Sequence, residues 1–290
     1  MTTSTWAGDI VVGVDGSEDS DRALDWAAAE ADRHGSALHI VHGVGTAPDP
    51  DKGTGPADGD LLTAQAARTM LDEAGERAAR EHPGLKVTTT LAYEEGPQAV
   101  LAAAAGAALT VLGTRGRGGF AALLLGSVAL RVAAHTTCPL VVVRGERARP
   151  AIGTVVVGVQ DEMDAHTVRF ALTTAARWHA SVRALHAWQP LGEVGLMATQ
   201  VDTVHELRTA HAALLSRTVE AAHLTAPKAP LSQEVVVSKP AVALVEASAE
   251  ADLVVVAAHR PHGPLGLRLG PVVHAVLHHS RCPVALVPDR

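Results

Sequence analysis

Aromatic side chains are scarce in this sequence, at 2% of its 290 residues, and its 24 lysines and arginines are outnumbered by 31 acidic residues. The net charge of −7 and the near absence of basic runs argue against a nucleic-acid partner, because phosphate contacts need clustered cations and base stacking needs aromatic rings. No apolar stretch reaches the roughly 18–20 residues of a membrane span, and the first residues lack a signal-peptide pattern. We therefore expect a cytoplasmic protein without nucleic-acid or membrane partners.

The chain also has few cysteines and lacks a P-loop sequence, which limits the disulfide and nucleotide chemistry to be expected. The two cysteines, Cys138 and Cys282, each precede a proline at equivalent places in the two halves of the chain, which favours buried structural thiols over a disulfide framework. The pattern G-x-x-x-x-G-K-S/T of P-loop hydrolases is missing, and no lysine lies near the glycine-rich loop of the chain to reach a β- or γ-phosphate. Fast nucleotide hydrolysis is therefore not expected.

That glycine-rich loop is the most informative feature present. Residues 113–127 read GTRGRGGFAALLLGS. Glycines allow positive φ angles and remove the Cβ atoms that would keep a ligand away from the backbone amides. The loop follows an apolar run and ends where a helix is expected to begin, so N–H groups and the helix dipole would converge on an anion. Ser127 adds a hydroxyl donor or metal ligand, and Arg115 and Arg117 either add positive charge or are simply solvated.

The sequence also repeats itself at an offset of about 145 residues. IVVGVDGS, starting at Ile10, matches VVVGVQDE, starting at Val155. A repeat of this length indicates a duplicated domain, because solenoid units are far shorter. We expect domains at residues 1–150 and 151–290, with the boundary near Pro150 in the charged segment GERARPAIG.

Each half alternates short Val/Ile/Leu-rich runs with longer Ala-rich segments of helical spacing. This alternation is typical of an α/β fold with a parallel sheet, and strands that are nearly all apolar suit a sheet covered on both faces. The expected strands lie near residues 10–15, 37–43, 87–92, 109–113 and 140–143, then 154–159, 182–187, 234–238, 253–257 and 284–287. The Gly/Pro/Asp-rich segment 45–60 is expected to be a mobile surface loop.

In its first strand, its glycine loop and its internal repeat, the chain resembles the universal stress protein family in its tandem two-domain form, and the resemblance covers nearly the whole chain. The G-x2-G-x9-G-S/T loop of that family is present as Gly113, Gly116, Gly126 and Ser127, and VVGVDGS with Asp15 matches its first strand and turn. The resemblance implies an open five-stranded parallel sheet of order 3-2-1-4-5 with helices on both faces. It also implies ATP at the carboxyl ends of strands one and four, which is the topological switch point of such a sheet.

The resemblance assigns the ATP contacts to the first domain, whose loop is intact. Asp15 would accept hydrogen bonds from the nucleoside, or else form a turn with its own backbone. Gly43 would lie against adenine and leave looser packing, since the family usually has a larger apolar side chain there. The expected contact residues are Val14, Asp15, Gly43, Gly113, Arg115, Gly116, Gly126, Ser127 and Val128.

The second domain has a degenerate loop. The equivalents of Asp15, Gly113, Gly116 and Ser127 are Gln160, Ala257, Arg260 and Pro271. Added Cβ atoms block the approach of phosphate and a proline removes an amide donor, so this domain is not expected to bind ATP in the same way. Five histidines surround the loop, and a surface cluster is expected of them rather than a metal site: His259, His262, His274, His278 and His279.

Three functions remain open at this stage. The leading hypothesis is a stress-response or signalling protein in which ATP binding changes conformation or the binding of unidentified protein partners, without catalysis. The second is a slow ATPase with a divalent metal such as Mg²⁺ at Ser127. The third is a nucleotide-independent scaffold whose domains pair through the last strands, residues 140–143 and 284–287, with a homodimer forming through other faces.

Overall fold

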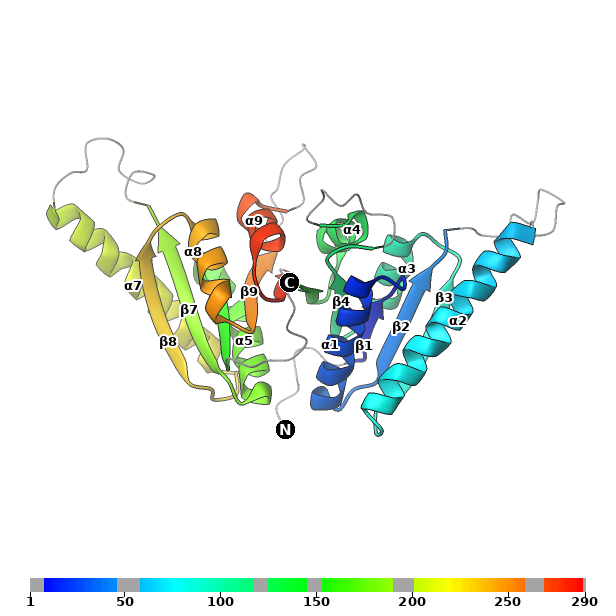
Figure 1. Cartoon of the computed structure of the whole chain (residues 1–290). Coiled ribbons are helices and arrows are strands. Elements are labelled where there is room, and N and C mark those ends of the chain that lie inside the picture. Colours follow the sequence, from blue (N-terminus) through cyan, green and yellow to red (C-terminus); the bar gives the residue numbers. More distant parts are fainter. Residues whose placement is uncertain are drawn as a thin grey trace. The chain divides into compact units, whose positions relative to one another are not determined.

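A computed structural model describes residues 8–45, 58–116, 125–144, 153–189, 201–258 and 269–288. The chain divides into two compact units, to which the described residues 8–144 and 153–288 belong (Figure 1). Each unit has its own sheet, helices and buried core. The boundary expected near Pro150 lies outside the described residues.

The first unit is a parallel sheet with helices packed against it. Its strands are β1 (Ile10–Gly13), β2 (Leu38–Gly43), β3 (Val87–Ala92), β4 (Leu109–Gly113) and β5 (Leu140–Val143). Its helices are α1 (Glu18–His34), α2 (Asp58–Glu81), α3 (Gly96–Ala103) and α4 (Ser127–His135). The strands pair in the order β3-β2-β1-β4-β5, so the order reverses between β1 and β4.

The second unit repeats this plan. Its strands are β6 (Thr154–Gly158), β7 (Ser181–Trp188), β8 (Leu231–Val237), β9 (Leu253–Ala258) and β10 (Val284–Pro288). Its helices are α5 (Ala165–Trp178), α7 (Val201–His223), α8 (Pro240–Ala247) and α9 (Pro271–His279), with single 3₁₀ turns η2 (Glu162–Asp164) and η4 (Ser248–Glu250). The order is β8-β7-β6-β9-β10, and every pairing recorded within the described part of either unit is parallel. The expected α/β class, with two tandem units, is confirmed.

Helix α1 shows how the sequence sets an element that borders the site. Ser17 caps its start, and the Ser17 hydroxyl accepts a hydrogen bond from the Ser20 amide at 3.2 Å. Acidic residues fill the first turn, where the helix dipole favours negative charge. Gly35 ends the helix at φ 66°, a left-handed conformation that glycine adopts without strain. The first turn of α1 is thereby held beside the carboxyl end of β1.

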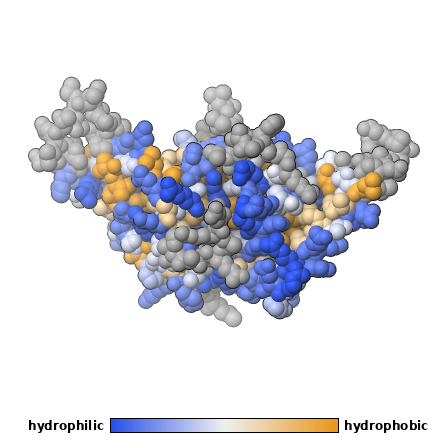
Figure 2. All heavy atoms as spheres, in the orientation of Figure 1, coloured by the Kyte–Doolittle hydropathy of each residue, from blue (hydrophilic) through white to orange (hydrophobic). Residues whose placement is uncertain are grey.

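Burial is high in most strands and low in β3 and β8. Ile10, Ile40 and Leu140 have no exposed surface, whereas the side chains of Thr88–Thr90 in β3 and Ser232 and Gln233 in β8 are exposed. The apolar strands β1, β4, β5, β9 and β10 are buried, as expected for a sheet covered by helices, whereas β3 and β8 carry exposed polar residues. Figure 2 shows hydrophilic residues over most of the described surface on the visible face.

Most expected strand bounds agree with the structure to within two residues, and two expectations differ more. Strand β8 begins at Leu231, ahead of the expected residue 234, because Leu231, Ser232 and Gln233 pair with β7 at the sheet edge. Helix α2 begins at Asp58, so the end of the expected loop 45–60 is helical, while residues 46–57 lie outside the described part of the chain. No helix within the described ranges combines the length and apolar character needed to cross a membrane.

The two cysteines are buried free thiols, as expected. Each follows a turn closed by a hydroxyl, since Thr136 Oγ1 donates to the carbonyl of Cys138 and Ser280 Oγ donates to that of Cys282, both at 2.9 Å. These bonds fix the entry into β5 and β10. The thiols therefore serve the packing of the last strand in each unit.

Candidate functional site

A cavity of 540 Å³ opens at the carboxyl ends of β1 and β4 in the first unit. The strand order reverses at this point, and ligands of open parallel sheets bind in the crevice formed there. The volume falls within the roughly 300–1,000 Å³ of small-molecule sites. All nine residues that the family resemblance assigned to ATP contact line the cavity, although they come from segments more than a hundred residues apart.

The carboxylate of Asp15 is oriented by the turn after β1. Its Oδ1 accepts hydrogen bonds from the Ser17 amide at 3.1 Å and from the Ser17 hydroxyl at 2.6 Å, which is an Asx turn. The turn-forming alternative is therefore present. The other oxygen, Oδ2, faces the glycine loop, because a Cβ added at Gly116 would lie 2.2 Å from it. One oxygen shapes the turn and the other faces the loop.

The described loop glycines are needed because other atoms lie very close to where a Cβ atom would be, and not because their backbone angles are unusual. Neither Gly113 nor Gly116 has a positive φ, so the expectation of positive φ is wrong for both; Gly118 and Gly119 lie outside the described residues. A Cβ at Gly113 would lie 2.5 Å from the backbone oxygen of Asp19. Glycine at this position lets the end of β4 pass the first turn of α1.

Helix α4 directs its amino terminus at the cavity. Gly126 is its N-cap, with ψ 157°, and the Gly126 amide donates to the carbonyl of Thr114 at 2.7 Å. No side chain caps the first amides in the described structure. The N–H groups of a first helical turn have no partner within the helix, so those of Ser127 and Val128 are placed to bind an anion at the cavity wall.

A buried carboxylate that the sequence analysis missed holds the loop to α1. Asp19 is 8% exposed; its Oδ2 accepts from Thr114 Oγ1 at 2.7 Å and from Arg115 Nε at 3.4 Å, and its Oδ1 accepts from Arg22. Burial acts to raise the pKa of Asp19, but the hydrogen bonds from Thr114 and Arg22 and the charge of Arg22 outweigh it, so the pKa lies below its ordinary value. Asp19 is therefore ionised at neutral pH.

Positive charge gathers beside this carboxylate. Arg115 is about half exposed and is ion-paired to Asp19, so it is not simply a solvated loop residue. Arg144, which directly follows β5, has a lowered pKa because it is buried and because Arg115 lies near, although the charge of Asp19 acts the other way. An anion at the loop would relieve the repulsion between the two arginines. Arg117 lies outside the described residues.

His42 and Gly43 shape the wall opposite the loop. The Nδ1–H of His42 donates to the Val14 carbonyl at 2.6 Å and ties the end of β2 to that of β1. A Cβ at Gly43 would lie 2.7 Å from the Glu94 carbonyl oxygen and 2.9 Å from the backbone of Gly96. The space that a larger side chain would take is thus filled by the backbone between β3 and α3, and Gly43 does not simply leave a void.

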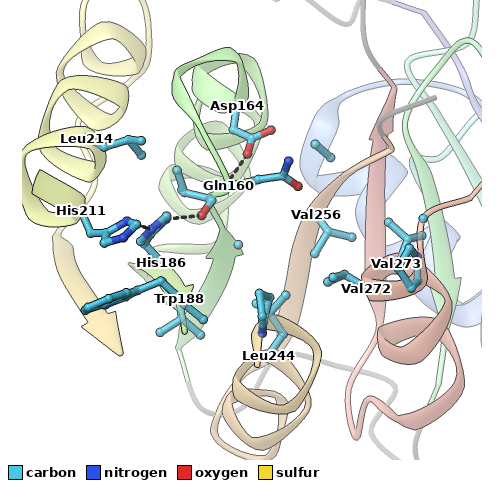
Figure 3. Close-up of a pocket in the computed structure, with 18 residues that line it drawn as sticks. Gln160, Asp164, His186, Trp188, His211, Leu214, Leu244, Val256, Val272 and Val273 are labelled. Atoms are coloured by element: carbon cyan, nitrogen blue, oxygen red, sulfur yellow. Dashed lines mark hydrogen bonds between the residues drawn. The ribbon is translucent and has the colours of Figure 1, made fainter. Parts of the chain in front are cut away.

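The second unit has a cavity of 560 Å³ at the equivalent place, the carboxyl ends of β6 and β9 (Figure 3). Gln160, Ala257 and Pro271 line it at the positions of Asp15, Gly113 and Ser127. Pro271 is the first residue of α9 and has no N–H to offer there. The carboxylate, the hydroxyl and the N–H group that the first cavity has at two of these positions are thus missing from the second, while Arg260 lies outside the described residues.

The histidines of α9 form a small stack. The rings of His274 and His278 lie 5.4 Å apart at an interplanar angle of 9°. Within the described residues there is no group of three or more histidine, cysteine, aspartate or glutamate side chains suited to a metal ion. His259 and His262, which belong to the expected cluster, lie outside those residues.

The fold and the two cavities define the class of protein: two doubly wound parallel α/β units in tandem, each hollowed at its switch point. A model of the universal stress protein family matches residues 8–144 and again residues 151–288. The chain therefore belongs to the universal stress protein family, in its tandem form.

Known proteins similar to the chain share its length. A universal stress protein of Mycobacterium tuberculosis is 32% identical to it over 95% of both chains, and one of Mycolicibacterium smegmatis is 29% identical over 97% of both. Among solved structures, a universal stress protein from Archaeoglobus fulgidus covers 97% of this chain and 98% of its own, with a TM-score of 0.69 and 14% identity. This last likeness concerns the fold.

Proposed function

We propose that the first unit binds one ATP molecule, and that occupancy of this site changes the conformation of the protein or its binding to protein partners during stress response or signalling. The observation that carries the proposal is the convergence of all nine expected contact residues on one cavity at the switch point. A helix amino terminus and Arg115 lie at the same cavity, and both attract phosphate.

The charges in the cavity support one orientation of the nucleotide. The phosphates belong at the start of α4, near Gly126, Ser127 and Arg115, where N–H groups and positive charge gather. The nucleoside belongs at the other wall, because the Asp15 carboxylate repels phosphates but accepts hydrogen bonds from ribose hydroxyls. Gly43 and the end of β2 border the base.

Binding without turnover fits the described lining better than hydrolysis does. None of the described residues around the cavity is a lysine, and the one carboxylate among them, Asp15, is held by Ser17 in a turn. A Mg²⁺ ion accompanying the phosphates would find the Ser127 hydroxyl at the cavity wall. Slow ATP hydrolysis is the alternative activity for the same site.

The first test is to denature protein purified without added nucleotide and to identify what it releases by mass spectrometry, followed by calorimetric titration of the emptied protein with Mg²⁺-ATP. We expect about one ATP per chain. Released ADP would support slow hydrolysis. Two equivalent sites per chain would contradict a degenerate second unit, and no binding at all would leave the nucleotide-independent scaffold as the function.

A pair of matched variants tests the location. Gly116→Glu forces side-chain atoms into the position of the Asp15 carboxylate and adds negative charge, so ATP binding should be lost. Gly84→Glu makes the same change at an exposed site where a Cβ meets nothing within 4 Å, and it should bind ATP normally. In stressed cells, a protein that acts through ATP should fail only with Gly116→Glu, whereas a pure scaffold should work with both.

A further inference from the structure

The cavity of the second unit matches that of the first almost position for position. Its volume, 560 Å³, is about the same as the 540 Å³ of the first, although several of its wall residues are larger. Where the first cavity has Gly43, Gly96, Gly113, Ser127 and Ala129, the second has Ala187, Pro240, Ala257, Pro271 and Val273. The added side chains have not filled the hollow, so the second cavity keeps room for a ligand of comparable size.

The changes share one direction, because each removes a polar group or adds apolar surface. Gln160 replaces the Asp15 carboxylate with a neutral amide, and Pro271 replaces the Ser127 hydroxyl and its N–H. None of the described residues around the second cavity is a lysine or arginine, whereas Arg115 lines the first. The carboxylate of Asp164 is turned to its own loop and accepts from the Gln160 amide at 2.6 Å. The described lining therefore offers no lysine or arginine to an anionic ligand, and Pro271 removes one of the first-turn amides at the start of α9.

A cluster found in the second unit closes one side of its cavity. In Figure 3, His186, His211 and Trp188 lie on one side and Val256, Val272 and Val273 on the opposite side. His186 Nδ1–H donates to the Val159 carbonyl at 2.8 Å, and His186 Nε2 lies 2.8 Å from His211 Nδ1. The Trp188 ring stacks on His211 at 4.5 Å.

Trp188 carries a hydrogen-bond donor that the described protein does not satisfy. The residue is 3% exposed, and its indole Nε1–H has no acceptor among the described residues. Buried donors without a partner are rare in folded proteins, because the lost hydrogen bond to water is not repaid. Since the Trp188 side chain lines the cavity, an acceptor atom on a bound molecule is a natural partner for it.

We propose that the second unit binds an uncharged, mainly apolar small molecule that carries a hydrogen-bond acceptor such as a carbonyl oxygen. The apolar body lies against Leu244, Val256 and Val273, and the acceptor meets the indole N–H of Trp188. The neutral carboxamide of Gln160 offers a second polar contact at the mouth. This site is separate from the ATP site and does not depend on it.

The test uses prodan, an uncharged naphthalene ketone whose emission shifts to the blue in apolar surroundings, titrated into the full-length protein. A matched pair of variants locates the probe, since Val272 and Val128 hold the same position in the two cavities. Val272→Trp overfills the second cavity and should weaken prodan binding about tenfold or more. Val128→Trp should leave prodan affinity within about twofold and should instead weaken ATP binding.

Two further measurements test the chemistry. Trp188→Phe keeps an aromatic ring but removes the donor, and should weaken prodan about two- to tenfold, the value of one hydrogen bond. A naphthalene sulfonate of similar size should bind the second cavity about tenfold or more weakly than prodan, because its charge is uncompensated there. Loss of prodan binding in Val128→Trp, displacement of prodan by ATP, tighter binding of the sulfonate, or no saturable prodan binding would each overturn the proposal.

Discussion

Replacement of Gly113 by alanine tests most directly whether the loop glycines act through close approach. The added Cβ would lie 2.5 Å from the backbone oxygen and 2.7 Å from the carbonyl carbon of Asp19. Both atoms belong to the backbone of α1 and cannot rotate away, so the end of β4 or the first turn of α1 must move. Overpacking of this kind costs about 1–3 kcal/mol, and we expect the upper part of that range.

The same movement should disturb the proposed ATP site. The Thr114 hydroxyl and Arg115 are bonded to the Asp19 side chain, so a shift of α1 displaces the residues that follow Gly113. We expect Gly113→Ala to lower the urea midpoint of the first unit by roughly 1 M and to weaken ATP about tenfold or more. Urea unfolding followed by hydrogen exchange assigns the change to a unit, and calorimetry measures the affinity.

Gly84→Ala is the control for this experiment. A Cβ at Gly84 meets nothing within 4 Å and the residue has no positive φ, so its free energy of unfolding should change by less than about 0.5 kcal/mol. The second unit provides an internal comparison, since Ala257 already occupies the position of Gly113. If Gly113→Ala unfolds and binds ATP like Gly84→Ala, the close contact between β4 and α1 does not constrain the site and the reasoning fails.

Three further changes separate the contributions of charge, hydroxyl and core. Asp19→Asn should lower the free energy of unfolding by about 1–3 kcal/mol at pH 7. The folded pKa of Asp19 lies below the unfolded value of 3.8, so the ionised carboxylate stabilises the fold above pH 3.8, and this effect is lost as pH falls through the folded pKa. Below that pKa, the free energies of unfolding of the variant and of the natural protein should therefore become equal. Ser127→Ala should weaken ATP up to about tenfold in calorimetry with an unchanged melting temperature, because the exposed hydroxyl contributes to binding and not to the fold. Leu172→Ala, at a fully buried position, should destabilise the second unit by about 2–5 kcal/mol while the first unit still binds ATP; loss of ATP binding would show that the two cores are not independent.

The strands could be predicted from local signals, and the residues that line the first cavity could be predicted from the family resemblance. An apolar run such as Leu109–Gly113 reads as a buried strand without further context, and the structure gives β4 these same bounds. A glycine loop between a strand and a helix likewise implies a cavity at the carboxyl end of that strand. The start of strand β8 was placed too late because Ser232 and Gln233 are polar, and a polar stretch at a sheet edge cannot be told from a loop in sequence.

The electrostatics of the site could not be predicted in this way. Asp19 and Thr114 are 95 positions apart; Asp19 belongs to no recognisable motif, and Thr114 is a variable position of the glycine loop. In the sequence, Arg144 is simply the residue after a strand. Its proximity to Arg115 becomes evident only when β4 is seen to pair with β5. The role of Gly113 was assigned to backbone angles and to the approach of a ligand, because sequence alone does not show that the backbone of α1 passes within contact distance.

Comparison of the two units distinguishes the hydrogen bonds that both folds share from the cavity residues that differ between them. His42 and His186 make the same bond to the end of the neighbouring strand, at Val14 and Val159, and Gly126 and Gly270 cap the equivalent helices. These shared contacts lie at the base and rim of each cavity and maintain its volume. The positions that differ project into the space between them, so they can change from polar to apolar without altering the sheet. One duplicated scaffold therefore presents a polar cavity in one unit and a mainly apolar cavity in the other, which is the basis for the two different ligands proposed above.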